Sequence, residues 1–306
     1  MGGGGSRTGY GAGDVDMPTL RERVERELQQ QEFLADVNDY LGELLSTFND
    51  RDTDAISERL DEIEAVLGNS IDAIDRLLFG GSVAKHTFVD GLSDVDALVL
   101  LSGGAQQDDP SELVVQFAEA LQVGLSADVA NVTTGALAVT VEYRDGTEVQ
   151  LLPAVERAGS ISIPSQSGTE WREIRPRKFA EKLTEVNQAN GGAVVPAIKL
   201  AKAALGDLPE VQRLSGYHIE ALAVDAFKTY DGSQSRQAVL RHLLDHVSRG
   251  VLTPTADITG QSVRIDEYLG PGGSNSRQQI SASVQRIVRK MDQATSLDDY
   301  RDIVGD

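Results

Sequence analysis

Two short motifs in the first third of the chain carry residue types that could do chemistry. Gly80, Gly81 and Ser82 let backbone N–H groups approach an anion closely, and the serine adds a hydroxyl, which suits a phosphate. Eleven residues separate Ser82 from Asp94, and Asp96 follows after a single valine. Because side chains alternate along a strand, both carboxylates would share one face, where they could hold two divalent cations. The motifs together predict a phosphate and metal site.

Each motif alone has a simpler interpretation. Gly-Gly-Ser also occurs in plain loops, and Asp-x-Asp also occurs at solvated strand edges. The combination at this distance, with an apolar strand after it, is much more specific. Two acids on a buried strand are costly unless cations pair with them, which favours the metal interpretation.

Hydrophobic spacing predicts the elements that position these motifs. The segment 94–101, DVDALVLL, has the apolar density of a buried strand, and a short helical stretch precedes it after Asn69, running into Leu77–Phe79. Segments 136–143 and 148–155 are predicted strands of a hairpin that turns at 144–147, where Asp-Gly is a strong turn signal. A helix opening at Ser111 and Glu112 carries Val115, Ala118 and Leu121.

Helices are predicted on both sides of this region. Apolar residues spaced by three and four predict a helix between Thr19 and Leu45 and a second from Ile56 to Leu67, ended by Gly68. Further helices are predicted over 179–188, 193–205, 211–230, 236–247 and 275–294, with a Gly- and Pro-rich loop over 253–273. A mixed lobe is therefore followed by a helical lobe, and small ligands usually bind in such a cleft.

The order of several sequence words extends the argument beyond the two motifs. The words are GGSVAKHT, SDVDALV, EVQLLPA, IPSQSGTEW, VVPAIKLAKAAL and LSGYHIEAL. In this order the chain resembles the DNA polymerase beta-like nucleotidyltransferase superfamily, and within it the bacterial cGAS/DncV-like nucleotidyltransferases (CD-NTases) and the oligoadenylate synthases, over Phe79 to Tyr230 and more loosely through DEYLG. The resemblance implies an α+β fold, with a nucleotidyltransferase palm of mixed sheet and helices, a C-terminal helical lobe and a ligand cleft between them.

The resemblance also implies domains and nucleotide-binding residues. We expect a flexible Gly-rich tail over 1–17, N-terminal helices and palm over 18–165, and the helical lobe over 166–306. Family members hold the donor phosphates with a lysine and stack its base on a tyrosine, roles that match Lys199 and Tyr217. The expected nucleotide-binding residues are Gly81, Ser82, Lys85, Lys199, Lys202 and Tyr217. The lysines could instead be solvated helix residues, and Tyr217 could be a core residue.

One position departs from the family pattern. The strand that reads EVQLLPA usually carries a third Asp three residues before the proline, where this chain has Gln150. If this strand's sheet also pairs with the strand of Asp94 and Asp96, Gln150 lies next to the two aspartates. An amide carries no charge, so one metal loses a ligand charge and the attacking hydroxyl loses a base. Glu148, two residues earlier on the same strand face, or Glu142 on the partner strand could substitute. Gln150 is also compatible with an engineered substrate trap or with a protein that only binds nucleotides.

These observations favour a nucleotidyltransferase that joins nucleoside triphosphates, ATP above all, into a cyclic or linear oligonucleotide second messenger, in the anti-phage defence role that the family implies. Asp94 and Asp96 are the metal ligands for Mg²⁺ or Mn²⁺, and an effector or regulatory protein is a possible partner. One alternative is a catalytically degenerate nucleotide sensor or partner subunit. Another is an RNA 3′-end nucleotidyltransferase, which is disfavoured because no basic stripe with interleaved aromatic residues is present.

Composition limits the other possibilities. The 306 residues include 48 acidic against 28 basic side chains, for a net charge of −20, which repels long duplex nucleic acid. Such acidity also marks salt-adapted proteins. Without cysteine, disulfides, thiolate metal sites and cysteine nucleophiles are excluded. No run of 18 apolar residues and no signal pattern is found, so no membrane association and a cytoplasmic location are expected.

Overall fold

The computed structural model describes residues 17–49, 53–71, 74–79, 95–102, 109–135, 137–157, 160–165, 170–257 and 265–305. The strands of this part are β1 (Ile74–Phe79), β2 (Val95–Leu101), β3 (Val129–Thr134), β4 (Val139–Tyr143), β5 (Glu148–Arg157), β6 (Ser160–Pro164) and β7 (Trp171–Ile174). The helices are α1 (Met17–Asn49), α2 (Thr53–Ser70), α4 (Pro110–Gly124), α5 (Pro176–Ala189), α6 (Val194–Gly206), α7 (Gly216–Ala226), α8 (Arg236–Gly250), α9 (Asn275–Gln293) and α10 (Leu297–Val304). The expected tail over 1–17 lies outside the described residues except for Met17.

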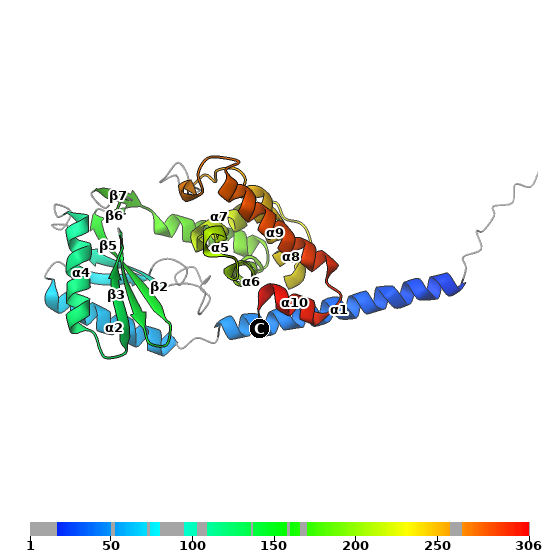
Figure 1. Ribbon diagram of the computed structural model, residues 1–306, viewed down its shortest axis with the longest axis horizontal. Helices are drawn as coiled ribbons and strands as arrows, with labels where there is room; N and C mark the ends of the chain where they lie inside the picture. Colours follow the sequence, from blue (N-terminus) through cyan, green and yellow to red (C-terminus); the bar gives the residue numbers. More distant parts are fainter. Residues whose placement is uncertain are drawn as a thin grey trace, which may run out of the picture.

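The seven strands of the described part form one mixed sheet. Five of them follow the order β1-β2-β5-β4-β3, and β6 pairs with β5 and then with β7. The β2–β5 pair is parallel, whereas the other pairs are antiparallel. We call the sheet with α2 and α4 the sheet lobe, and the bundle of α5 to α10 the helical lobe (Figure 1). The expected α+β fold, with a mixed sheet followed by a helical lobe, is confirmed.

The core of the sheet lobe lies between the sheet and helices α2 and α4. Alternate residues of β2 and β5, such as Val99 and Leu151, pack there with Phe117 of α4. The intervening residue Leu100 packs on the opposite face, which explains why β2 reads as an unbroken apolar run. Helix α4 begins where the Asp109 side chain accepts a hydrogen bond from the Ser111 backbone N–H. Its residue Val115, expected in the apolar stripe, is 49% exposed.

The helical lobe has its own core, and the second half of α1 belongs to it. Val37, Leu41 and Leu44 of α1 are buried with residues of α6 and α8. The Tyr40 hydroxyl donates a hydrogen bond to the carbonyl oxygen of Gly305, which ties α1 to the end of α10. The sheet continues to β7, past the expected division at residue 165. None of the helices in the described part is long and apolar enough to cross a membrane.

Several local predictions are wrong, each for a physical reason. Leu77–Phe79 end the strand β1 and not a helix, because this short apolar run pairs with β2. Helix α2 continues through Gly68 to Ser70. Gly68 does not have the positive φ of a helix-ending glycine, and a Cβ at this position would meet no other atom within 4 Å. The expected helix over 211–230 is a 3₁₀ turn (Glu210–Gln212) followed by α7, whose start Ser215 caps through its side chain. Strands β3, β6 and β7 and helix α10 are further elements that apolar spacing did not reveal.

Candidate functional site

The parallel pairing of β2 with β5 brings two of the expected site positions together. Asp96 and Gln150 are partners in the strand register, as the sequence predicted on the condition that the two strands pair. Flanking residues Val149 and Leu151 are buried toward α2 and α4, so Gln150 belongs to the opposite face of the sheet. Figure 1 shows α4 on the side of the sheet away from the helical lobe. The face with positions 96 and 150 is therefore directed toward the helical lobe.

Acidic and polar residues extend this face across β5 and β4. Gln150 is the register partner of Thr140, and Glu148 is the register partner of Glu142. Glu148 is exposed, whereas Gln150, Thr140 and Glu142 are half-buried. Like charges at facing register positions are unfavourable by themselves and attract cations. The expected placement of Glu148 and Glu142 near the third-acid position is thus confirmed, and their catalytic role stays a prediction.

Four expected site residues lie outside the described residues: Gly81, Ser82, Lys85 and Asp94. For Asp96 only the strand position is described. In the part of the chain that the structure describes, no group of three or more His, Asp or Glu side chains is gathered tightly enough to hold a metal ion. Glu142, Glu148 and Gln150 are among the residues that offer oxygen donors at this face, the ligand type that Mg²⁺ and Mn²⁺ prefer.

A second group of expected residues meets at the start of α7. The Lys202 Nζ is 3.1 Å from Glu220 Oε1, and the two side chains are 5% and 1% exposed. A Cβ built on Gly216 would lie 3.2 Å from the same Nζ, so this ammonium is adjacent to the residue before Tyr217. The Tyr217 ring packs at 4.6 Å between centroids on Phe179 of α5, and its hydroxyl donates to Asp257 Oδ1 at 3.3 Å. Lys202 and Tyr217 therefore share one end of the helical lobe.

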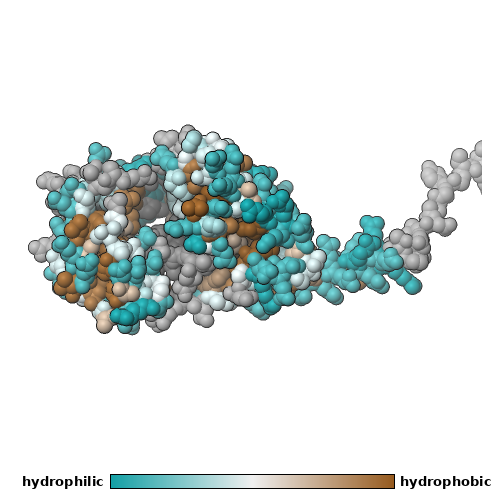
Figure 2. Space-filling model, viewed as in Figure 1, coloured by the Kyte–Doolittle hydropathy of each residue, from teal (hydrophilic) through white to brown (hydrophobic). Residues whose placement is uncertain are grey.

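Lys199 belongs to a different neighbourhood. Its side chain is buried and donates a hydrogen bond to Asn49 at the end of α1. Neither lysine is the solvated helix residue that the sequence allowed as an alternative. Sequence reasoning also missed Glu220 and Asp257, because their partners are distant in the chain and no local pattern announces them. In Figure 2 a hollow opens between the sheet lobe on the left and the helical lobe.

A buried polar network supports the start of α7 from behind. The His218 side chain shares hydrogen bonds with the Tyr268 hydroxyl at 3.2 Å and the Thr255 hydroxyl at 3.1 Å. Burial lowers the pKa of His218 to about 4; Asp266 opposes this shift and Arg277 adds to it. Arg277 donates to Asp266 Oδ2 at 2.7 Å, and both side chains are fully buried. This network fixes the loop after α8 against the helix that carries Tyr217.

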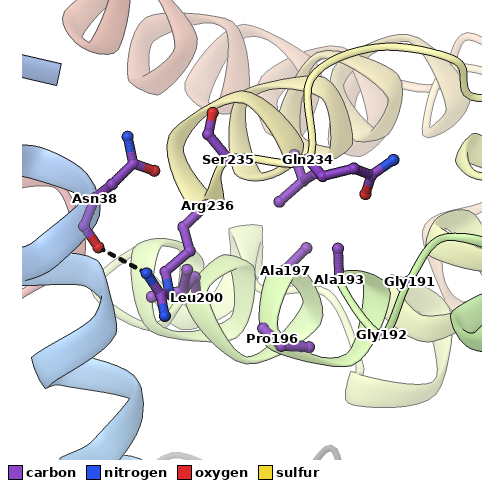
Figure 3. A pocket seen from close by; sticks show the side chains of 11 residues that line it. Asn38, Gly191, Gly192, Ala193, Pro196, Ala197, Leu200, Gln234, Ser235 and Arg236 are labelled. Carbon is purple, nitrogen blue, oxygen red and sulfur yellow. Dashed lines mark hydrogen bonds between the residues drawn. The ribbon is translucent and has the colours of Figure 1, made fainter. Parts of the chain in front are cut away.

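A separate cavity of about 540 Å³ lies within the helical lobe (Figure 3). It is lined by the start of α6, the start of α8 and Asn38 of α1. The Arg236 Nη1 donates to the Asn38 carbonyl oxygen at 3.2 Å along its wall. No expected site residue of the described part lines this cavity, so it is distinct from the candidate site.

Comparison with known proteins assigns the chain. A family model described as "Second Messenger Oligonucleotide or Dinucleotide Synthetase domain" matches residues 35–187, which include β2, β5 and the face just described. The chain belongs to this family. Membership confirms the resemblance to CD-NTases and makes the chain a nucleotidyltransferase of second-messenger synthesis. No curated protein sequence matches it.

Solved structures of CD-NTases share the fold at low sequence identity. CdnG of Bradyrhizobium diazoefficiens, in complex with GTP, is 13% identical with a TM-score of 0.61, over 81% of this chain and 89% of that one. CdnC of E. coli MS115-1, with ATP, is 18% identical with a TM-score of 0.58, over 83% and 91%. The cyclic AMP-GMP synthase DncV of Vibrio cholerae is 10% identical with a TM-score of 0.61, over 95% and 91%. The likeness covers both lobes of the synthetase.

Proposed function

We propose that this synthetase joins nucleoside triphosphates, ATP among them, at the sheet face that carries positions 96 and 150. One observation carries the proposal: the register of the parallel β2–β5 pair sets the third-acid position directly beside Asp96. This face is directed toward the helical lobe, where Lys202 and Tyr217 lie at the start of α7. Structures similar in fold were solved with GTP and with ATP, which supports this substrate class.

The donor set fits a hard divalent cation, Mg²⁺ or Mn²⁺. The described face offers carboxylate and amide oxygens and no sulfur or imidazole, and Asp94 and Asp96 would be the main ligands. When bound, such cations supply positive charge to the phosphate oxygens and lower the pKa of the attacking hydroxyl. Family membership supports dependence on a divalent cation, and the choice of metal is part of this proposal.

The chain's own residues would bind and orient the donor nucleotide. Gly81, Ser82 and Lys85 would contact its phosphates, as the motif predicts. The Lys202 ammonium, paired with Glu220 next to Gly216, would add charge near those phosphates. The Tyr217 ring, already packed on Phe179 on one side, would stack on a purine. Lys199 would act from the junction of α1 with α6, close to Asn49.

Gln150 supports a second candidate, a nucleotide-binding sensor or partner subunit without turnover. Its amide oxygen can accept a hydrogen bond or ligate a cation, but it adds no charge beside Asp96 and cannot take a proton. Glu148, two residues away on the same face, is the residue that would restore base assistance. For the active enzyme we propose a cytoplasmic reaction, a role in anti-phage defence and a product read by an effector protein.

Product analysis separates these functions. The purified full chain is incubated with each labelled nucleoside triphosphate, singly and combined, with Mg²⁺ or Mn²⁺ and with or without RNA. Cyclic or linear oligonucleotides formed without RNA support the synthetase. Metal-dependent binding without product supports the sensor, and extension of RNA alone supports a 3′-end transferase. Absence of metal-dependent nucleotide binding would overturn the proposed site.

A further inference from the structure

The first half of α1 projects away from the rest of the molecule (Figure 1). Every residue from 21 to 32 is exposed, and contact with the helical lobe begins near Phe33. We call residues 21–32 the arm. These residues alone would form only a marginal helix in water, so the arm is held by the packed second half of the 33-residue α1 and gains from any surface that covers it. The arm also exposes two apolar side chains, Val24 at 46% and Leu28 at 53%.

The sequence around the arm has an unusual symmetry. Residues 20–28 read LRERVEREL. Read outward from Val24 in both directions, every arginine on one side matches a glutamate on the other, and a leucine ends each side. The matched charged pairs are Arg21 with Glu27, Glu22 with Arg26, and Arg23 with Glu25.

This symmetry is favourable for two identical helices that pair in antiparallel orientation. In a twofold pair, if one residue of the first copy contacts another residue of the second copy, the same contact is repeated with the two copies exchanged. If the twofold axis passes by Val24, residues equally far from Val24 on opposite sides lie at the same height in the two copies. Each matched arginine and glutamate would therefore lie at the same level of the pair, one on each helix.

Helical geometry places the apolar residues at the centre of such a pair. At 3.6 residues per turn, Val24 and Leu28 lie on one face of the arm, with Arg21 and Glu27 on its two flanks. Val24 would pack against Val24 of the second copy, and Leu28 would lie level with position 20. Along the flanks, Arg21 would approach Glu25 of the second copy. Arg23, which pairs with Glu27 of its own helix at 3.3 Å in the single chain, would also approach Glu27 of the second copy.

We propose that the arm is a self-recognition element, through which two copies of this chain form an antiparallel helix pair centred on Val24. A different partner would not require charges inverted about one residue. The arm carries three arginines and four glutamates, so it is close to neutral in a chain of net charge −20, and two arms repel each other little. The short contact implies a weak dimer that forms with rising concentration.

Charge exchange tests the pairing in the full chain. Sedimentation equilibrium should show a wild-type mass that rises toward two chains with concentration. Val24→Glu should lose the dimer, as should Arg21→Glu with Arg23→Glu, and separately Glu25→Arg with Glu27→Arg. An equimolar mixture of the two charge variants should regain it, because every facing pair is again opposite in sign. Val123→Glu, at a valine that is 90% exposed on α4, is the matched control and should behave as wild type.

Cross-linking tests the orientation, since the chain has no cysteine of its own. Val24→Cys should oxidise to a covalent dimer. Leu28→Cys alone should not, because two antiparallel copies of position 28 lie about 12 Å apart along the axis. A mixture of Leu28→Cys with Leu20→Cys should cross-link. A wild-type monomer at all concentrations, a dimer indifferent to the charge variants, or self-linked Leu28→Cys would overturn the proposal.

Discussion

Two polar regions of this synthetase differ in how their charges are balanced. In the helical lobe, Asp266 and Arg277 are fully buried and form an ion pair. Arg277 also donates hydrogen bonds to the backbone carbonyl oxygens of Val251, Thr253 and Gly270. On the sheet face, Glu142 and Glu148 are register partners, and Gln150 lies beside Asp96. A carboxylate enclosed with its counter-charge serves the fold. Acids gathered on an accessible face suit a ligand that brings positive charge.

The largest effect is expected on the sheet face. Asp96→Asn should lower the rate of nucleotide joining by at least about 10³-fold, because the metal loses a charged ligand. The thermal midpoint should stay level or rise, since a like charge has been removed. The assay combines initial rates with a thermal melt, and Asp128→Asn, an exposed acid of the same lobe, is the control. An Asp96→Asn protein of normal activity would remove this face from the mechanism.

The buried ion pair should show the opposite pattern. Asp266→Asn leaves the Arg277 charge enclosed without its partner and should cost about 3–5 kcal/mol of unfolding free energy. Urea unfolding measures it. Asp298→Asn breaks an exposed pair with Arg301 and should cost less than about 1 kcal/mol. Equal losses in the two variants would mean that burial does not separate the two kinds of carboxylate.

The same network predicts a pH dependence of stability. The pKa of His218 is lowered to about 4 in the folded protein, against about 6.5 when unfolded, so the unfolded state takes up the proton first. The contribution of His218 to the unfolding free energy is fully present above about pH 6.5. It is lost as the pH falls toward 4, and the total loss is about 3 kcal/mol. The measurement is unfolding free energy against pH for wild type and for His218→Gln, which cannot titrate. Parallel curves would contradict the prediction.

The smallest effect is expected at Gln150, the uncharged residue beside Asp96 on the sheet face. Gln150→Asp should raise the rate of nucleotide joining by at least about tenfold, because it adds a carboxylate beside Asp96. Gln150→Asn introduces a side chain of the same size as Asp but without its charge, so it should not raise the rate of nucleotide joining. If Gln150→Asp has no effect while Glu148→Gln inactivates, Glu148 is the working third acid. If Gln150→Asp binds ATP and Mg²⁺ but stays inert, the sensor function is preferred.

The sequence predicted the strand β2 and its partner β5 because each has a strong local signal, an apolar run or a hairpin turn. It could not separate β1 from a helix, since a three-residue apolar run fits both periods. β6 and β7 are short and carry Ser, Pro and charged residues, so they form only because neighbouring strands offer an edge.

The same limit applies to the candidate site. That Gln150 lies near the two aspartates was predicted on the condition that the strands pair, because alternation puts these positions on one face of the sheet; the register that makes Asp96 its partner is set by the packing of the two strands. The burial of Lys202 with Glu220 did not follow, since each looks like a surface residue on its own helix and only the packing of α6 on α7 joins them. Contacts between elements therefore decide what local patterns leave open.

The packing of α1 has a consequence for the order in which the protein can be made. A ribosome produces α1 first, yet the residues that bury Val37 and Leu41 come from helices α6, α8 and α10 much later in the sequence, and Tyr40 bonds to Gly305. The sheet lobe can fold while synthesis continues, because its core draws only on residues from α2 to β7. The apolar stripe of α1, with Val37 and Leu41, is therefore exposed to water until α6, α8 and α10 have been synthesised.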